Sequence, residues 1–258
     1  MNLALGFSSR KITRIDKKMT KEEQRNIFIE HFQKQIENIN SISCDNESLF
    51  KKTLYLNMID ALSKVATYPK NHELSVKFAN TIKRFGNWEE CDKISLPSLN
   101  YRLQNKKNSS LHGYIEPDNL KSMLEKWPIK SPIKIELNHD LNFESLKHSK
   151  ILKNGKELDN NIKKHQHVSL LWKYRCCLTH SFDEPVAVHE ENIEYPYYHG
   201  VLLASSHDKR HEIRLCYPIN FLKKLTETIT SNLGTFLKEK DISPHKAFNY
   251  QLYCIDRT

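Results

Sequence analysis

Apolar residues recur every three or four positions along the first third of this chain, and that spacing predicts amphipathic helices. We expect three of them, over residues 20–38, 46–67 and 72–85. Thr20 followed by Glu23 has the pattern of a capping box, which indicates a well-defined start for the first helix. This part of the chain therefore predicts a helical bundle.

Beyond these helices, Ser95-Leu96-Pro97 is typical of another helix start, and residues 104–157 have weaker patterns. Short helices are expected over residues 116–127 and 141–152, and alternating apolar residues at 133–137 indicate a short strand. We interpret 104–157 as an irregular insertion within one domain that covers residues 1–258. The insertion either shapes substrate entry or only adds packing, and we favour packing.

Residues 158–180 have the apolar spacing of one long helix that ends before Pro185, because proline cannot continue a helix. Its apolar positions are Leu170, Leu171, Tyr174, Cys177 and Leu178. After it, residues 195–204 and 212–217 are rich in strand formers and predict a β-hairpin around the loop S-S-H-D-K-R.

A last helix is expected from Pro218, followed by a terminal strand over residues 248–255. Together these elements predict a mainly α protein, a helical bundle with a small β-hairpin or sheet after the helix at 158–180.

Composition adds a basic character to this fold. The chain has 258 residues, with 40 Lys and Arg against 31 Asp and Glu, which gives a net charge of +9. Such a charge suits an anionic partner and favours RNA modestly, and a solvated, Lys-rich surface explains it as well. The longest apolar runs are far shorter than a membrane span, so we expect a cytoplasmic protein with no membrane partner.

Metal and disulfide chemistry is not indicated. The six cysteines are scattered, with one adjacent pair and no C-x-x-C spacing, so neither a zinc site nor a disulfide framework is expected. His207 and His211 have helical spacing but lie in the predicted hairpin loop, and we do not interpret them as ligands. No cofactor is expected.

Arg175 and His180 are the candidate catalytic residues. A guanidinium fits a phosphate, and an imidazole can give or take a proton near neutral pH. Five residues apart on a regular helix, they lie about 140° apart around its axis. They converge only if the helix loosens at its end or if two copies of the chain face each other. Converged, they would suit RNA cleavage without a metal ion.

The arrangement of an Arg, four residues and a His at the end of an apolar helix resembles the HEPN superfamily. Phe182 and Glu184-Pro185 look like the sequence that follows this motif in several bacterial members. The resemblance implies a homodimeric, metal-independent endoribonuclease that acts as a toxin or a phage-defence effector. Cys176 departs from the family, in which a polar residue commonly follows the Arg.

That departure keeps other functions open. One alternative is a non-catalytic HEPN module that binds nucleic acid or a nucleotide, with Cys176 marking a site that has lost activity. Another is a structural protein or an antitoxin-like partner of a toxin. RNA cleavage in chelator separates the first hypothesis from these two.

Further residues are candidates for supporting roles. Asp60 falls among the apolar positions of helix 46–67, so it either faces solvent, which is favoured, or is a buried acid that needs a cation. The family resemblance implies Arg175 as that cation. The candidate RNA-binding residues are Lys163, Lys164 and Lys173, beside which His165 and His167 either extend the basic patch or are simply exposed helix residues. The basic residues 1–19 are either an arm that touches nucleic acid or a frayed terminus.

Overall fold

The computed structural model describes residues 19–68, 72–105, 110–127, 134–153, 160–181, 192–205 and 208–247, and within these it is mainly helical. The α-helices are α1 (Lys21–Asn40), α2 (Glu47–Ala66), α3 (Leu74–Phe85), α4 (Leu96–Asn105), α5 (Pro117–Leu124), α6 (Phe143–Lys147), α7 (Asn160–Lys163), α8 (His167–Ser181) and α9 (Ile219–Glu239). The 3₁₀ turns are η1 (Glu89–Asp92), η2 (Ser110–Gly113), η3 (Leu137–His139) and η4 (Pro244–Ala247). The strands are β1 (Lys134–Glu136), β2 (Tyr197–Ser205) and β3 (Asp208–Cys216).

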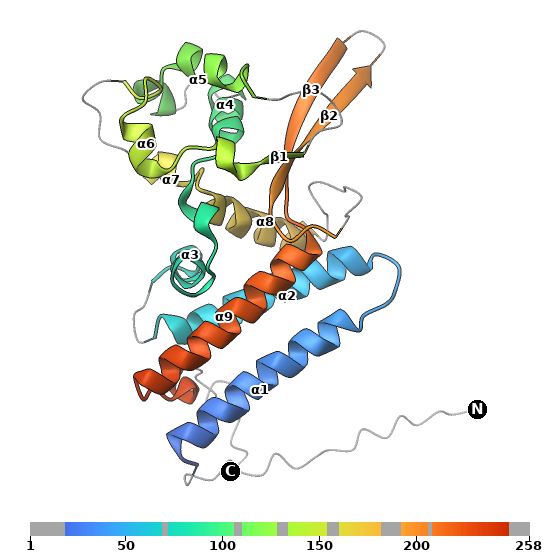
Figure 1. Cartoon of the computed structure of the whole chain (residues 1–258), viewed down its shortest axis with the longest axis vertical. Helices are drawn as coiled ribbons and strands as arrows, with labels where there is room; N and C mark the ends of the chain where they lie inside the picture. The colour runs from blue at the N-terminus through green and yellow to red at the C-terminus, as the bar shows by residue number, and fades with distance from the viewer. Residues whose placement is uncertain are drawn as a thin grey trace, which may run out of the picture.

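The long helices α1, α2 and α9 pack side by side at one end of the elongated molecule (Figure 1). Each presents an apolar stripe to the others because its apolar residues repeat at helical spacing. Phe28, Phe32 and Ile36 form the stripe of α1, and Leu225 and Ile229 belong to that of α9. Burial of these stripes holds the three helices together.

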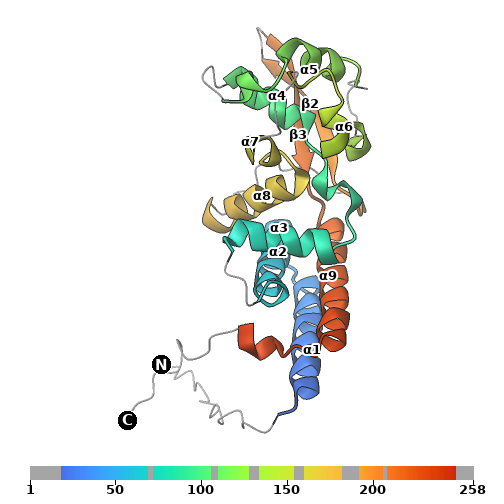
Figure 2. The same ribbon diagram turned by 90° about the vertical axis from the view of Figure 1, so that its left-hand side faces the viewer.

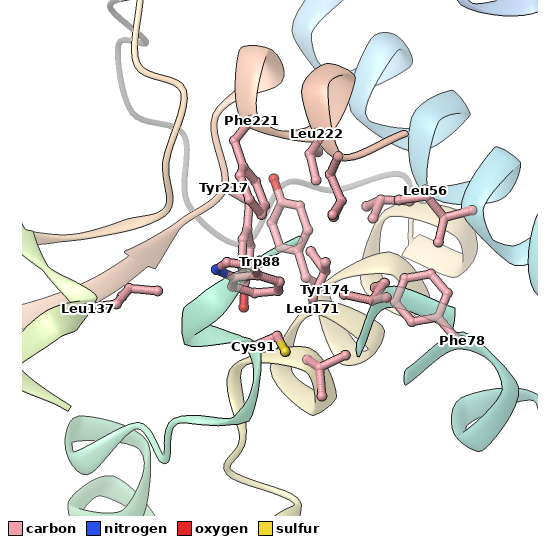
Figure 3. Packing of buried hydrophobic residues seen from close by; sticks show 14 of the residues in the cluster. Leu56, Phe78, Trp88, Cys91, Leu137, Leu171, Tyr174, Tyr217, Phe221 and Leu222 are labelled. Carbon is pink, nitrogen blue, oxygen red and sulfur yellow. The ribbon is translucent and has the colours of Figure 1, made fainter. Parts of the chain in front are cut away.

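Helices α3 and α8 form the middle of the molecule. Both pack on α2, and α3 also packs on α8 and α9. Figure 2 shows α8 lying across the molecule, with α2, α3 and α9 on one side of it and the lobe that holds α4 to α7 on the other. In Figure 3, Leu171 and Tyr174 of α8 lie among aromatic and aliphatic side chains from the other elements. One cluster of buried residues therefore joins the two ends of the molecule.

At the other end, the short helices α4 to α7 lie beside a three-stranded antiparallel sheet of order β1-β2-β3 (Figure 1). Ile135 of β1 is opposite Tyr198 of β2, and β2 pairs with β3 from Tyr197 opposite Cys216 to Ser205 opposite Asp208. Segment 134–153 thus contributes an edge strand and two short helical pieces to this lobe.

A buried polar network fixes the lobe to α8. The Oδ2 atom of Asp140 lies 2.8 Å from Nε2 of His167 and accepts a hydrogen bond of 2.6 Å from the hydroxyl of Tyr198. The other oxygen of Asp140 accepts from the backbone N–H of Leu96 at 2.9 Å, and Tyr198 also contacts Ser95 at 2.7 Å. Because the side chains of Asp140 and His167 are fully buried, these bonds have no competition from water.

The structure confirms the predicted mainly α fold with a small sheet. The capping box is present, with Thr20 and Glu23 exchanging side-chain and backbone hydrogen bonds. The helices expected at 46–67 and 72–85 correspond to α2 and α3. The expected terminal strand at 248–255 and the basic residues 1–18 lie outside the described residues. None of the helices in the described part of the chain is long and apolar enough to cross a membrane.

One predicted element is wrong, and the bounds of another differ from those expected. The single helix expected at 158–180 is interrupted between α7 and α8, because the backbone of residues 165–167 bonds instead to residues 93–95. The predicted hairpin is present, but its second strand is longer than expected, since β3 begins at Asp208 inside the predicted loop, while β2 ends at Ser205. The interpretation of 104–157 as an insertion stays a prediction.

Candidate functional site

The candidate site is built on α8, which three buried residues hold in place. Leu171, Tyr174 and Leu178 recur at spacings of three and four and face the core. The hydroxyl of Tyr217 donates to the carbonyl of His167 at 3.3 Å, which ties the first turn of the helix to the end of β3. The helix continues to Ser181, so Arg175 and His180 both lie within regular α-helix.

Arg175 is held by an ion pair with α2. Its Nη2 donates to Oδ2 of Asp60 at 3.0 Å, and the two side chains are only 15% and 12% exposed. The guanidinium also lies 5.2 Å from the ring centroid of Trp172, within range of a cation–π contact. Asp60 is therefore paired with Arg175, and the favoured expectation that Asp60 faces solvent was wrong.

The pair leaves part of the guanidinium for other partners. An arginine has five N–H donors, and Asp60 accepts from one of them. The Nε of Arg175 and the Oδ1 of Asp60 are buried without a hydrogen-bond partner among the described residues. The arrangement thus fixes the position of Arg175 and leaves only the small exposed part of its side chain to meet a phosphate oxygen.

His180 differs from Arg175 in both exposure and direction. Its side chain is exposed, and it forms no hydrogen bond or ion pair with another residue that the structure describes. Because α8 is regular to Ser181, His180 lies about 140° around the helix from Arg175. The expected loosening of the helix end, which would let the two side chains meet within one chain, is not found.

The neighbours of the motif are polar on the side of α2. Thr179 places its hydroxyl 3.4 Å from Oδ1 of Asn57, one turn before Asp60. Cys176 is half-buried and Cys177 is exposed, and both are free thiols. Asn57 and Trp172 were not singled out from the sequence, since nothing local to them signals a contact with α8 or with Arg175. Phe182 and Glu184-Pro185 lie outside the described residues.

The candidate RNA-binding lysines lie before α8 and in its middle, since Lys163 ends α7, Lys164 follows it and Lys173 belongs to α8. Lys163, Lys164 and Lys173 are all exposed. The ammonium of Lys173 donates to the backbone carbonyl of Lys164 at 3.0 Å, and that of Lys164 donates to Asn161 at 2.9 Å. The ammonium of Lys163 lies 5.8 Å from the ring centroid of Phe143.

His165 and His167 are buried, with exposures of 6% and 0%, so both sequence interpretations, a basic patch and exposed helix residues, are wrong. Nδ1 of His165 lies 2.8 Å from the hydroxyl of Ser98. Burial, helped by the charges of Lys173, Arg102 and Lys164, lowers the pKa of His165 to about 4. This histidine is therefore neutral near pH 7 and does not add positive charge.

Among the residues that the structure describes, no group of three or more His, Cys, Asp or Glu side chains is placed to hold a metal ion. The arrangement offers a fixed guanidinium and an exposed imidazole on one helix, with an acid that orients the guanidinium.

Comparison of the chain with protein-family models, with curated proteins and with solved structures finds no match.

Proposed function

We propose that this protein is a metal-independent endoribonuclease of the HEPN type, acting as a toxin or a phage-defence effector. The observation that carries the proposal is the placement of Arg175 and His180. The ion pair with Asp60 fixes the guanidinium of a side chain that is still 15% exposed, and His180 is exposed at the end of the same helix. Arg175 would bind the scissile phosphate, and His180 would act as general base or acid.

The active form is a homodimer in this proposal. Within one chain the two side chains point to different sides of α8, which leaves a single phosphate in contact with only one of them. A two-fold axis near the end of α8 would bring Arg175 of one protomer towards His180 of its partner. The dimer thereby supplies the convergence that a single helix does not.

An apolar groove beside the motif supports this arrangement. The groove has a volume of about 890 Å³ and lies between α1 and α2. Its wall includes the apolar residues Ile27 and Leu54, which are 51% and 39% exposed. Asn57 lines the groove and contacts Thr179 of α8, so the groove adjoins the end of the motif helix. Exposed apolar surface of this kind is typical of an interface.

The test is RNA cleavage in the presence of EDTA. The wild-type protein should cleave RNA but not DNA and leave a cyclic phosphate, because the ribose 2′-hydroxyl is the nucleophile. His180→Ala should lower the rate about 10²- to 10⁴-fold, the usual contribution of a proton-transfer group. Arg175→Lys keeps the charge but loses the fork, so it should be impaired less than Arg175→Ala.

His148→Ala is the matched control, since His148 is also exposed at the end of a helix but lies in the other lobe. Its rate should equal that of the wild type. Cleavage that EDTA abolishes, or that His180→Ala leaves unchanged, would refute the proposed mechanism.

The second candidate function is a non-catalytic module that binds RNA or a nucleotide. One observation favours it: Arg175 is already engaged by Asp60, and Cys176 beside it offers only weak hydrogen bonding. Binding of RNA without cleavage would select this function. Neither binding nor cleavage would leave the role of a structural or antitoxin-like partner.

A further inference from the structure

Three cations from different elements meet where α4 approaches the joint between α7 and α8. Arg102 is in the last turn of α4, Lys164 follows α7, and Lys173 belongs to α8. The contact of 2.8 Å between Ser98 and His165 fixes α4 against the joint. Arg102 is one turn beyond Ser98 on the same face of α4, so it projects towards the two lysines. We call Arg102, Lys164 and Lys173 the cation cluster.

Among the described residues, no carboxylate forms an ion pair with the cation cluster. Although the Lys173 side chain as a whole is exposed, partial burial of its ammonium, with the charges of Arg102 and then Lys164, lowers its pKa. Among the described residues, the charged groups that act on the buried His165 are likewise all cations. The bond from Lys173 to the carbonyl of Lys164 keeps the two lysines together despite their repulsion. Arg102 is exposed and pairs with no carboxylate of the described residues. A bound anion would relieve this repulsion.

The cluster continues along α8 in one direction. Lys173 and His180 are seven residues apart, so they lie on nearly the same face, about 10 Å apart along the axis. Cys177, between them, is also exposed. At the other end, Tyr101 is 69% exposed beside Arg102 and presents an aromatic ring on which a base can stack. Lys173, Cys177 and His180 thus share one exposed face of α8, and the cation cluster lies at the start of this face.

We propose that the cation cluster binds backbone phosphates of single-stranded RNA and that the strand runs along the exposed face of α8 towards His180. This inference rests on the proposed function for its choice of RNA. It adds Arg102 and Tyr101 to the predicted RNA-binding residues and gives the strand a direction. Lys163, whose ammonium lies against Phe143, is outside the cluster.

The experiment uses a single-stranded 2′-O-methyl RNA oligomer, which binds without being cleaved because it has no free 2′-hydroxyl. Its affinity for the full chain is measured by fluorescence anisotropy from low to physiological salt. Arg102→Gln and Lys173→Gln should each weaken binding about fourfold at physiological salt and reduce the slope of log affinity against log salt by about 0.7. Tyr101→Ala should weaken binding with the salt slope unchanged.

Lys238→Gln is the matched control, because Lys238 is an exposed cation in the last turn of α9, at the other end of the molecule. It removes the same charge and should leave affinity and slope unchanged. Equal losses in Lys238→Gln and Arg102→Gln would overturn the inference, since binding would then depend on net charge alone. Wild-type protein that does not bind the oligomer would overturn it as well.

The ligand and the chemistry are tested separately. Inorganic phosphate that binds this cluster in calorimetry, with no binding of the oligomer, would overturn the assignment to RNA. Cleavage of natural RNA with unchanged binding in Arg102→Gln and Lys173→Gln would overturn the inference and leave the proposed function standing. If these variants bind more weakly and the wild-type protein does not cleave RNA, the RNA-binding role of the cluster would be supported and the proposed function would be refuted.

Discussion

Arg175 and Asp60 carry opposite charges that are mostly withdrawn from water, and each depends on the other for its main partner. A buried charge without a partner is costly, so the pair constrains α2 against α8 more strongly than an exposed ion pair would. The same contact orients the guanidinium that the proposed function needs. Under the proposed function, stability and activity are therefore coupled at Asp60.

Asp60→Ala should lower the free energy of unfolding by about 2 kcal/mol, because it leaves the guanidinium of Arg175 without its charged acceptor. Urea unfolding measures this loss. In a double-mutant cycle with Arg175→Ala, the two losses should add to more than the loss in the double variant.

Glu144→Ala serves as the control for this cycle, since it breaks the exposed pair of Glu144 and Lys147 and should cost less than about 0.5 kcal/mol. Strict additivity of Asp60→Ala and Arg175→Ala would mean that the ion pair contributes nothing to the fold.

His165 should make stability depend on pH. Burial and three nearby cations lower its pKa to about 4 in the folded state, against about 6.5 in the unfolded chain. The unfolded state thus binds more protons between these values, and stability falls as pH drops through this window, by on the order of 3 kcal/mol in all. Urea unfolding at pH 7 and pH 5 measures about 2 kcal/mol of it.

In His165→Gln, this loss of about 2 kcal/mol of stability between pH 7 and pH 5 should disappear. His148→Gln, which replaces an exposed histidine, should keep it. An equal pH dependence in His165→Gln and the wild type would show that other groups cause the loss.

The sequence could indicate these residues but not their partners. Asp60 stands out as an acid among apolar positions, yet helical spacing alone fits both a solvent-facing and a paired carboxylate. Its partner is 115 residues away in the chain. His165 and His167 look like exposed helix residues until the backbone of residues 93–95 is known to cover them. Long-range contacts decided both cases.

At the scale of elements, local signals were sufficient where they were strong. The capping residues Thr20 and Glu23 and the periodic apolar stripes predicted the long helices α1, α2 and α9 within a few residues. The division between α7 and α8 has no local signal, because Lys164 to Gln166 contain neither glycine nor proline. The bridge between Ile94 and Gln166 replaces helical hydrogen bonds there, and the sequence does not reveal that pairing.

The end of α3 depends on the small size of Gly86. A Cβ atom at this position would lie 2.6 Å from the carbonyl oxygen of Ile82 and 2.8 Å from Cδ1 of Leu225. Gly86→Ala should therefore force a shift of α3 against α9 and cost about 1–3 kcal/mol in thermal or urea unfolding.

Gly113→Ala is the matched control, because a Cβ atom there meets no atom within 4 Å. It should change stability by less than about 0.5 kcal/mol. Equal effects of the two substitutions would show that the contact at Gly86 is not limiting.

At the scale of the whole molecule, α8 connects the lobe of short helices and strands to the long helices. It carries Arg175 on the side of α2 and Lys173 and His180 on the exposed side. If the site forms between two protomers, then each chain supplies a different residue to each of two sites. This gives a test that no single-chain site would pass.

Arg175→Ala and His180→Ala should each be inactive alone and should regain activity when mixed. About half of the dimers in an equal mixture are mixed, and each has one intact site of two, so about a quarter of the wild-type rate is expected. Leu54→Glu in both chains should abolish this recovery, because it places a charge in the apolar groove. Sedimentation would show whether the dimer is lost, and no recovery on mixing would contradict a shared site.

Because α8 is regular to Ser181, the proposed activity should depend steeply on the concentration of the protein. Under the proposed function, Arg175 and His180 point to different sides of one regular helix, so the monomer is inactive. The chain becomes active only when it dimerises. Well below the dissociation constant, a tenfold drop in concentration would lower the amount of active pair about a hundredfold. A cell could then tolerate a low concentration of this protein and still respond steeply when its expression rises. The dissociation constant of the dimer would set the threshold concentration.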